Sequence, residues 1–344
     1  DDGSLGQGND FPLPMYRHHL QPGLNKKRKN TSNTRAIYWG KRLLTLWEGG
    51  LPYKIDSLAL STEGKSQLGG VMGPDISLSG KAACDANTNR LVFYSNAPDS
   101  GSSELTLYEF DSNFGIIKGK NEQRNCKLPG YALLNDFAVT ENFAIFIQPP
   151  LETNMFPFMM SKDPHSSLKR KENENAILHL IPRMDSNAPM RSFAIPMDEL
   201  SDCDAHFINA YEIGDEIVLD VIRSDGRSNA GKNLSWPWAQ SVEDYSQIAS
   251  GKSLWRYRVQ ISSGAIAKDL LSDQHCAFAN VNPVVSGVKH RYIYSNVGGM
   301  GFDVAPPQVI SKFDCETRTV DTWLPEAFEF CGEPMFASRK GVDA

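Results

Sequence analysis

One histidine of this chain stands where it could bind a metal ion. His206 opens the segment HFINAYE (206–212), and a neutral imidazole is a common ligand of first-row metals. If this segment is a β-strand, His206, Ile208 and Ala210 share one face. A lone histidine is more often structural than a ligand, so its sequence context must decide.

The remaining histidines and the cysteines show no ligand spacing. The six cysteines include no C-x-x-C pair, so neither a zinc site nor a disulfide framework is indicated, and we expect reduced thiols. His179 lies in an apolar run, while His275 and His290 match no ligand motif. We expect these three to be structural or exposed.

Four segments resemble the carotenoid cleavage oxygenases in order and spacing. They are LLTLWEGGLPY (43–53), LNDFAVTEN (134–142), HFINAYE (206–212) and GEPMF (332–336). The resemblance runs from Asn33 to Gly341. It implies cleavage of a polyene C=C bond by O2 at a non-haem Fe(II), without an organic cofactor. It also implies a seven-bladed β-propeller with iron on its axis and an apolar tunnel for a carotenoid or apocarotenoid.

The resemblance places four histidines around the iron, and this chain keeps one that we can see. His206 matches the third ligand position, Asn135 stands at the second, and Lys81 stands at the first, in a stretch where relatives read Ser-Ala-His-Pro. An amide oxygen holds iron poorly compared with imidazole, and an ammonium has no lone pair and repels a dication. The fourth ligand is expected beyond Ala344. No catalytic residue is assigned outside this metal site.

Carboxylates that orient the ligand imidazoles are also expected from the resemblance. Glu48 and Glu333 fall on two of three such positions, and Ala277 replaces the third. Without imidazoles to hold, these acids need other partners. We therefore hypothesise that Lys81 forms a salt bridge with Glu48 or Glu333.

Short β-branched and aromatic runs, separated by turn residues, predict an all-β fold. Their number favours a β-propeller over a single sandwich. Compared with the family, the propeller is expected to be incomplete and the chain to be a fragment. The predicted strands are 35–39, 43–47, 90–94, 105–110, 137–140, 143–147, 176–182, 216–223, 254–261, 292–295 and 309–313.

The domain prediction is a polar, irregular leader at 1–33 followed by the propeller at 34–344. A cap insertion is expected near 149–175. Its apolar residues at 149–160 have two readings: peripheral membrane contact at the tunnel mouth, or an ordinary loop whose Met and Phe side chains pack on the propeller rim.

Charge and hydropathy exclude some partners. The formal net charge of -6 gives no general attraction to nucleic acid, so no nucleic-acid partner is expected. No apolar stretch approaches the roughly 18 residues of a membrane span. The expected protein is soluble or peripheral to a membrane, and intracellular (cytoplasm or plastid) rather than secreted.

Two functions remain open from the sequence. The first is oxidative cleavage of a polyene with O2 and Fe(II). The second is a lapsed oxygenase, a pseudoenzyme that binds an apolar polyene or serves as a propeller scaffold without turnover.

Overall fold

The computed structural model describes almost only β-structure. It covers residues 29–99, 101–118, 123–153, 168–171, 174–195, 205–224, 241–249, 251–299, 304–326, 329–337 and 339. Among these residues the α-helical part is one short helix, α2 (Val242–Ile248), which Ser241 caps by accepting the Asp244 N–H.

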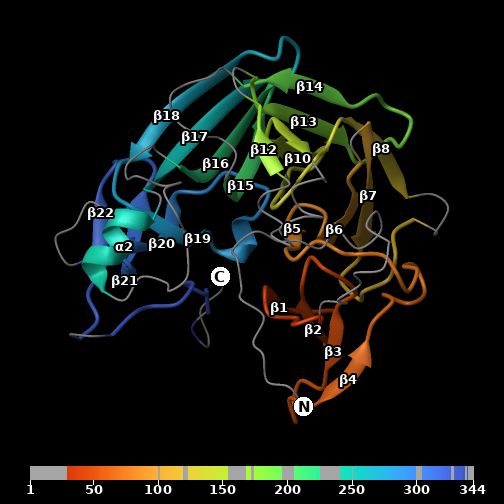
Figure 1. Cartoon of the computed structure of the whole chain (residues 1–344), viewed down its shortest axis with the longest axis horizontal. Helices are drawn as coiled ribbons and strands as arrows, with labels where there is room; N and C mark the ends of the chain where they lie inside the picture. Colours follow the sequence, from red (N-terminus) through yellow and green to blue (C-terminus); the bar gives the residue numbers. More distant parts are fainter. Residues whose placement is uncertain are drawn as a thin grey trace. The chain divides into compact units, whose positions relative to one another are not determined.

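Five four-stranded antiparallel sheets follow one another along the chain (Figure 1). The first holds β1 (Arg35–Trp39), β2 (Arg42–Leu46), β3 (Tyr53–Ile55) and β4 (Thr62–Lys65). The second holds β5 (Ala83–Asp85), β6 (Arg90–Ala97), β7 (Ser102–Phe110) and β8 (Arg124–Pro129). The third holds β9 (Ala138–Val139), β10 (Phe143–Gln148), β13 (Ile177–Pro182) and β14 (Arg191–Ala194). The fourth holds β15 (His206–Ile213), β16 (Glu216–Ser224), β17 (Lys252–Gln260) and β18 (Ile266–Ser272). The fifth holds β19 (Cys276–Asn280), β20 (Tyr292–Gly298), β21 (Pro307–Asp314) and β22 (Val320–Trp323).

The predicted cap insertion interrupts the third sheet between its second and third strands. Its described parts include two short paired strands, β11 (Leu151–Thr153) and β12 (Leu168–Arg170). The Lys171 N–H donates to Pro150 O over 2.9 Å, which brings the two ends of the insertion together. Residues 154–167 lie outside the described residues, so the two readings of 149–160 stay predictions. Of the predicted leader at 1–33, the described part is 29–33.

The chain divides into two compact units, which we treat separately. The first comprises Asp1–Ala82, Leu91–Asn135 and Leu151–Lys169. Within it, the Trp39 indole N–H donates to Asp111 O over 2.6 Å, and the Arg42 guanidinium lies 5.0 Å from the centre of the Phe114 ring. These contacts join the β1–β2 hairpin to the turn that follows β7.

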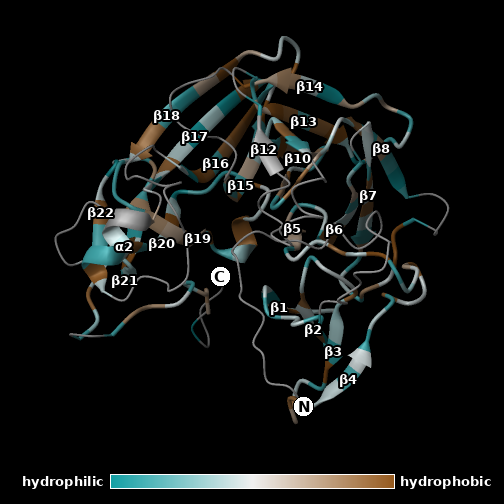
Figure 2. Cartoon of the chain, viewed as in Figure 1, coloured by the Kyte–Doolittle hydropathy of each residue, from teal (hydrophilic) through white to brown (hydrophobic). Residues whose placement is uncertain are grey.

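The second unit comprises Ala83–Arg90, Asp136–Pro150 and Arg170–Ala344. Its sheets pack through two apolar clusters. One joins the third and fourth sheets and includes Ile145, Leu178 and Leu219, and the other joins the fourth and fifth sheets and includes Ile222 and Ile293. Figure 2 shows the apolar character of β13 and β16. Packing of successive sheets face to face is how propeller blades stabilise one another.

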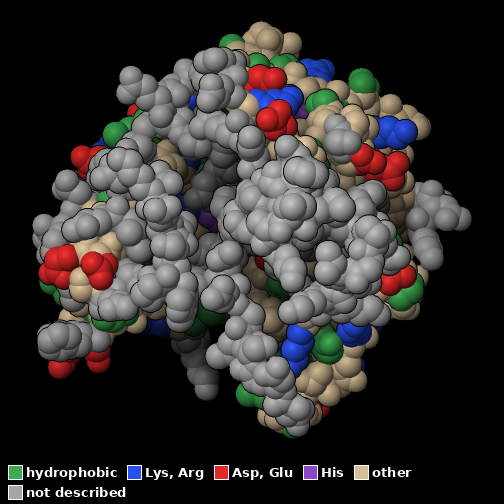
Figure 3. Space-filling view, in the orientation of Figure 1, with side chains coloured by type: hydrophobic (Ala, Val, Ile, Leu, Met, Phe, Trp, Pro, Cys, Tyr) green, Lys and Arg blue, Asp and Glu red, His purple; other side chains and the backbone are tan. Residues whose placement is uncertain are grey.

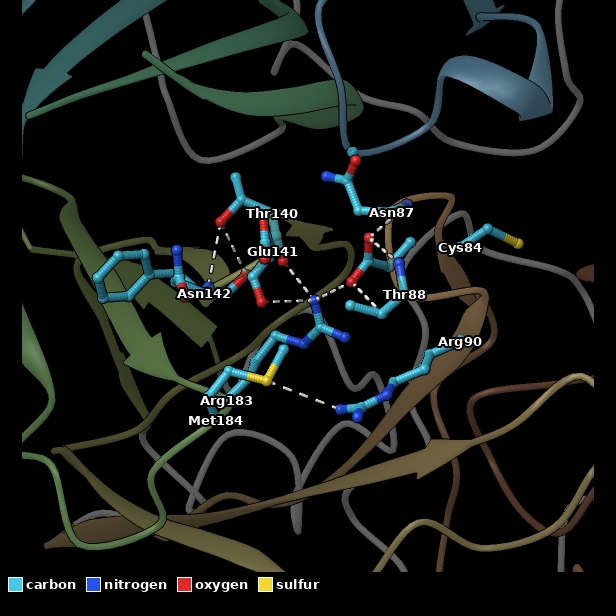
Figure 4. Close-up of polar contacts among 12 residues, drawn as sticks. Cys84, Asn87, Thr88, Arg90, Thr140, Glu141, Asn142, Arg183 and Met184 are labelled. Carbon is cyan, nitrogen blue, oxygen red and sulfur yellow. Dashed lines mark hydrogen bonds and ion pairs between the residues drawn. The ribbon is translucent and has the colours of Figure 1, made fainter. Parts of the chain in front are cut away.

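A buried ion pair lies at the turn that follows β5 (Figure 4). The Arg183 Nη1 donates to Asp85 Oδ2 over 2.8 Å, and both side chains are fully buried. The same Nη1 also donates to the Thr140 carbonyl oxygen. Asp85 accepts hydrogen bonds from the Asn87 N–H and the Thr88 hydroxyl. One guanidinium thus connects the β5–β6 turn to the β9–β10 turn.

His179 is a structural histidine, as the sequence predicts. It is fully buried in β13, with Nε2 2.9 Å from Gln148 Oε1 and Nδ1 2.8 Å from Ser192 Oγ. A neutral ring that donates from Nε2 and accepts at Nδ1 satisfies both contacts. Burial lowers the pKa of His179 from 6.5 to about 4.

This lowered pKa makes stability depend on pH. Below pH 6.5 the unfolded chain binds a proton that folded His179 binds only near pH 4, so stability falls as the pH falls. We expect the free energy of unfolding to drop by about 2 kcal/mol between pH 7 and pH 5 from this group. Urea titrations should show that His179→Gln removes this part of the slope. If the free energy of unfolding of His179→Gln depends on pH as steeply as that of the parent chain, buried His179 is not the source of this dependence.

On the face drawn in Figure 3, the coloured Lys and Arg side chains are scattered among acidic ones instead of forming one patch. Among the described residues, no helix is long and apolar enough to cross a membrane.

Candidate functional site

His206 is the first residue of β15, next to the buried carboxylate of Asp136. One Asp136 oxygen accepts the Phe207 N–H over 2.9 Å, and the other accepts the Phe137 N–H over 2.7 Å. The His206 Nδ1 lies 3.9 Å from Asp136 Oδ2, with half of the His206 side chain exposed. Asp136 therefore joins two of the predicted family segments and fixes the start of β15 beside the candidate ligand.

The expected face of His206 needs a correction. The pairing of β15 with β16 shifts between Phe207 and Asn209, because a β-bulge inserts one extra residue there. His206 then pairs with Ile222, and Asn209 pairs with Asp220. Since Ile222 and Asp220 are two residues apart on β16, His206 shares its face with Asn209 and not with Ala210.

Asn209 holds the loop at 282–290. Its Oδ1 accepts the Gly287 N–H over 2.8 Å, and its Nδ2 donates to Val285 O and Val288 O at 3.1 and 2.9 Å. Within this loop the Ser286 Oγ donates to Cys84 O over 2.6 Å, and the Ser286 backbone carbonyl accepts the Ala86 N–H over 2.9 Å. The loop thus bonds both to β15 and to the end of β5.

A buried charged cluster that the sequence did not reveal lies beside Asn209. Arg256 donates to both oxygens of the fully buried Asp220 at 2.7 and 2.8 Å, and His290 Nε2 lies 2.9 Å from Asp220 Oδ2. Burial favours a raised pKa for Asp220, but hydrogen bonds from Arg256 and His290 bring the pKa below its usual value. Burial and the nearby Asp220 raise the pKa of the Cys315 thiol to about 11.

Asp220, His290 and Cys315 form the one group of this kind, among the described residues, whose ligand atoms lie close enough to share a metal. Arg256 already occupies both oxygens of Asp220 with a guanidinium that would repel a metal cation. The cluster is therefore a buried ion pair between strands, and it contains none of the predicted ligands.

Lys81 and Asn135, the substituted ligand positions, both belong to the first unit. Lys81 is half-buried. The Asn135 Oδ1 is buried without a hydrogen-bond partner among the described residues. An unpaired amide oxygen can accept a hydrogen bond or touch a cation, but it is a weak ligand.

The two retained carboxylates have other partners than imidazoles. Glu48 Oε2 accepts the Thr34 hydroxyl over 2.7 Å, and Glu333 Oε1 accepts the Asn280 amide over 2.7 Å. Lys81 and Glu48 lie in the first unit and Glu333 in the second, and the salt bridge hypothesised for Lys81 stays a prediction.

Ala277, which takes the place of the third carboxylate, pairs with Asn296. The Asn296 amide donates to Cys331 O and Gly332 O at 2.8 and 2.7 Å. The segment around Glu333 is therefore held by two asparagine side chains.

The donor set does not fit the four-imidazole iron site that the resemblance implies. It offers one imidazole at His206, one amide at Asn135 and one ammonium at Lys81, and the ammonium disfavours a divalent cation. The structure joins His206 to Asp136 within the second unit. That the three positions meet around one centre stays a prediction, since His206 lies in a different unit from Lys81 and Asn135.

Comparisons with known proteins agree with the motifs. Residues 6–344 match the family described as retinal pigment epithelial membrane protein. Apocarotenoid-15,15'-oxygenase from Synechocystis sp. (strain ATCC 27184 / PCC 6803 / Kazusa) is 30% identical over 324 residues, which cover 91% of this chain and 62% of that protein. Chloroplastic carotenoid cleavage dioxygenase 7 from Oryza sativa subsp. japonica is 23% identical over 411 residues, which cover 96% of this chain and 65% of that protein.

A solved structure of cobalt-substituted Synechocystis apocarotenoid oxygenase matches with a TM-score of 0.79 and 28% identity, covering 93% of this chain and 65% of that one. This likeness and the five four-stranded sheets confirm the predicted all-β propeller fold. The chain spans less than two thirds of the length of each of these three relatives.

Proposed function

Because this chain belongs to the family of the carotenoid cleavage oxygenases, we propose that its ligand is an apolar polyene, a carotenoid or an apocarotenoid. The names of the Synechocystis and rice relatives support this substrate class. The protein's part would be to hold a rigid polyene in an apolar site.

We propose that the chain binds this polyene and cleaves it little or not at all with iron. The observation that carries it is Lys81 at a ligand position, together with the amide of Asn135 at a second one. Loss of partners that merely orient ligands already lowers metal affinity by roughly 10–100-fold, so loss of the ligands themselves should cost more.

Oxidative C=C cleavage with O2 and Fe(II) is the second candidate function. It is favoured by the retained His206, whose strand is fixed by Asp136, and by the presence of Glu48 and Glu333. It is the reaction that the names of the relatives suggest.

The test measures iron and polyene on the same preparation. After anaerobic loading with Fe(II) and desalting, we expect the unmutated chain to retain about a tenth of an equivalent of iron or less. A β-apocarotenal should quench its tryptophan fluorescence saturably, without oxygen-dependent aldehyde products. The Lys81→His/Asn135→His variant should retain more iron, and adding His206→Ala to it should remove that gain.

Near-stoichiometric iron in the unmutated chain, with cleavage products, would contradict the proposal and establish the second candidate. Absence of saturable quenching would exclude polyene binding as the function. The remaining function would then be a propeller scaffold without turnover.

Two finer proposals concern location. The segment 149–160 is proposed to contact a membrane peripherally, which vesicle flotation can test.

The protein is proposed to act inside the cell, in the cytoplasm or a plastid, and the chloroplastic rice relative supports the plastid.

A further inference from the structure

The loop at 282–290 connects the first strands of two other sheets within the second unit. On one side, Ser286 exchanges two hydrogen bonds with the end of β5, at Cys84 O and the Ala86 N–H. On the other side, the loop is bound by Asn209 of β15. Figure 1 shows the short turn of this loop, in blue, between β19 and β5. The loop is therefore a strap from the fourth sheet to the second.

The side-chain amide of Asn209 has a fixed orientation and no hydrogen to spare. Its Oδ1 accepts the Gly287 N–H over 2.8 Å, which places Nδ2 on the other side. The Nδ2 lies 3.1 Å from Val285 O, 2.9 Å from Val288 O and 2.9 Å from His290 Nδ1. Three acceptors thus share the two hydrogens of one amide nitrogen. The His290 Nδ1 must face this nitrogen with a lone pair.

A proton on His290 Nδ1 is incompatible with this arrangement. It would point an N–H at an amide nitrogen that can only donate, over 2.9 Å. Turning the Asn209 amide over would set its Oδ1 against two carbonyl oxygens and its Nδ2 against the Gly287 N–H. The ring cannot simply move aside, since His290 is buried and Tyr211 meets it edge-on, with the ring centres 5.8 Å apart. Protonation must therefore break bonds between Asn209 and the loop.

The charged and titratable groups around His290 leave this conflict in place. They are Tyr211, Asp220, Arg256 and Cys315, with the exposed Lys289 and Arg291 beside it in the chain. Asp220 lies 2.9 Å from Nε2 and attracts a protonated ring, but Arg256 binds both Asp220 oxygens and its charge opposes that attraction. Burial raises the pKa of Tyr211, and burial and Asp220 raise the pKa of the Cys315 thiol to about 11, so both stay neutral at pH 5–8.

We propose that the loop at 282–290 is a proton-sensitive strap, which joins the end of β5 to β15 while His290 Nδ1 is unprotonated and releases it when Nδ1 takes a proton. Histidine is the side chain that ordinarily changes charge between pH 5 and 8. The strap is closed at the upper end of this range and opens as the pH falls. This device goes beyond the proposed polyene binding and involves no iron.

Amide hydrogen exchange tests the strap, because the Ala86 and Gly287 N–H groups donate to Ser286 O and Asn209 Oδ1 when it is closed. Mass spectrometry of short peptides measures their protection at pH 7 and pH 5, after correction for the intrinsic effect of pH on exchange. We expect protection of both amides in the parent chain to fall by about tenfold or more, the size of losing one or two hydrogen bonds. The Leu219 amide, in the middle of β16, should keep its protection.

His290→Asn is the main variant, because an asparagine oxygen can replace Nδ1 as the acceptor but takes no proton. It should protect Ala86 and Gly287 equally at both pH values. Asn209→Leu removes the partner of the loop and should give low protection at both. His179→Gln is the matched control: it removes another buried histidine of the same unit and should keep the loss seen in the parent chain.

Asn209→Asp tests the inference independently of any change at His290. A carboxylate at 209 accepts from a protonated ring instead of opposing it, so acid should no longer lower the protection of Gly287. Thermal melts confirm that each variant is folded. Equal protection at both pH values in the parent chain, an equal loss at Leu219, a loss abolished by His179→Gln, or one retained in His290→Asn or Asn209→Asp would overturn the inference.

Discussion

Replacing Arg183 with methionine is expected to lower the free energy of unfolding by about 3–5 kcal/mol, because the variant leaves a buried carboxylate without its cation. Asp85 and Arg183 are both fully buried, and Arg183 also donates to the Thr140 carbonyl. Methionine keeps much of the side-chain volume, so the loss should come mainly from the charge and the hydrogen bonds. Urea unfolding at pH 7 measures it.

Arg258→Met is the control for Arg183→Met. Arg258 pairs with Glu216 over 2.6 Å, but 44% of its side chain is exposed, and solvent-exposed pairs contribute about 1 kcal/mol or less. Adding Asp85→Asn to Arg183→Met should recover part of the loss, since it removes the unpaired charge. Similar losses in the free energy of unfolding for Arg183→Met and Arg258→Met would show that burial does not strengthen the Asp85–Arg183 pair.

Asp220→Asn is expected to destabilise the second unit by about 3 kcal/mol or more, because it leaves Arg256 without a counter-ion inside the fourth sheet. The substitution nearly preserves shape and removes one negative charge. Since hydrogen bonds lower the pKa of Asp220, its contribution is present above the unfolded pKa of about 3.9 and is lost only as the pH falls through the folded value. The effect should therefore be fully present at pH 7.

Asp269→Asn provides the exposed comparison on the same sheet. Asp269 pairs with Arg318, with 45% and 48% of the two side chains exposed, so its loss should cost about 1 kcal/mol or less. Chemical denaturation at pH 7 compares both variants with the parent chain. An Asp220→Asn variant as stable as Asp269→Asn would contradict the prediction. It would mean that the negative charge of Asp220 contributes nothing net to the free energy of unfolding.

Most strands in the middle of the sheets were predictable, and most edge strands were not. The predicted strand at 35–39 coincides with β1, and 176–182 and 216–223 differ from β13 and β16 by one residue at one end. Strands β13 and β16 carry apolar runs that pack between sheets. Strands β4 and β22 were not predicted, and their residues are mostly or wholly exposed. A strand held at a sheet edge by backbone pairing alone leaves no hydrophobic period to detect.

The candidate site shows the same limit. The motifs located His206, Glu48 and Glu333, but their partners depend on contacts that no local pattern encodes. The bulge that turns His206 onto the face of Asn209 has no glycine or proline to signal it. The Asp220–Arg256 pair lies 36 residues apart in sequence, on strands that had been predicted only for their apolar residues.

The loop at 282–290 also constrains when the protein can finish folding during its synthesis. Ser286 bonds to Cys84, 202 residues earlier, and to the neighbouring Ala86. These polar groups of the first-made part of the second unit gain their native partners only after residue 286 has left the ribosome. Until then the Cys84 carbonyl and the Ala86 N–H lack these two partners, so the end of β5 completes its bonding late although it is made early.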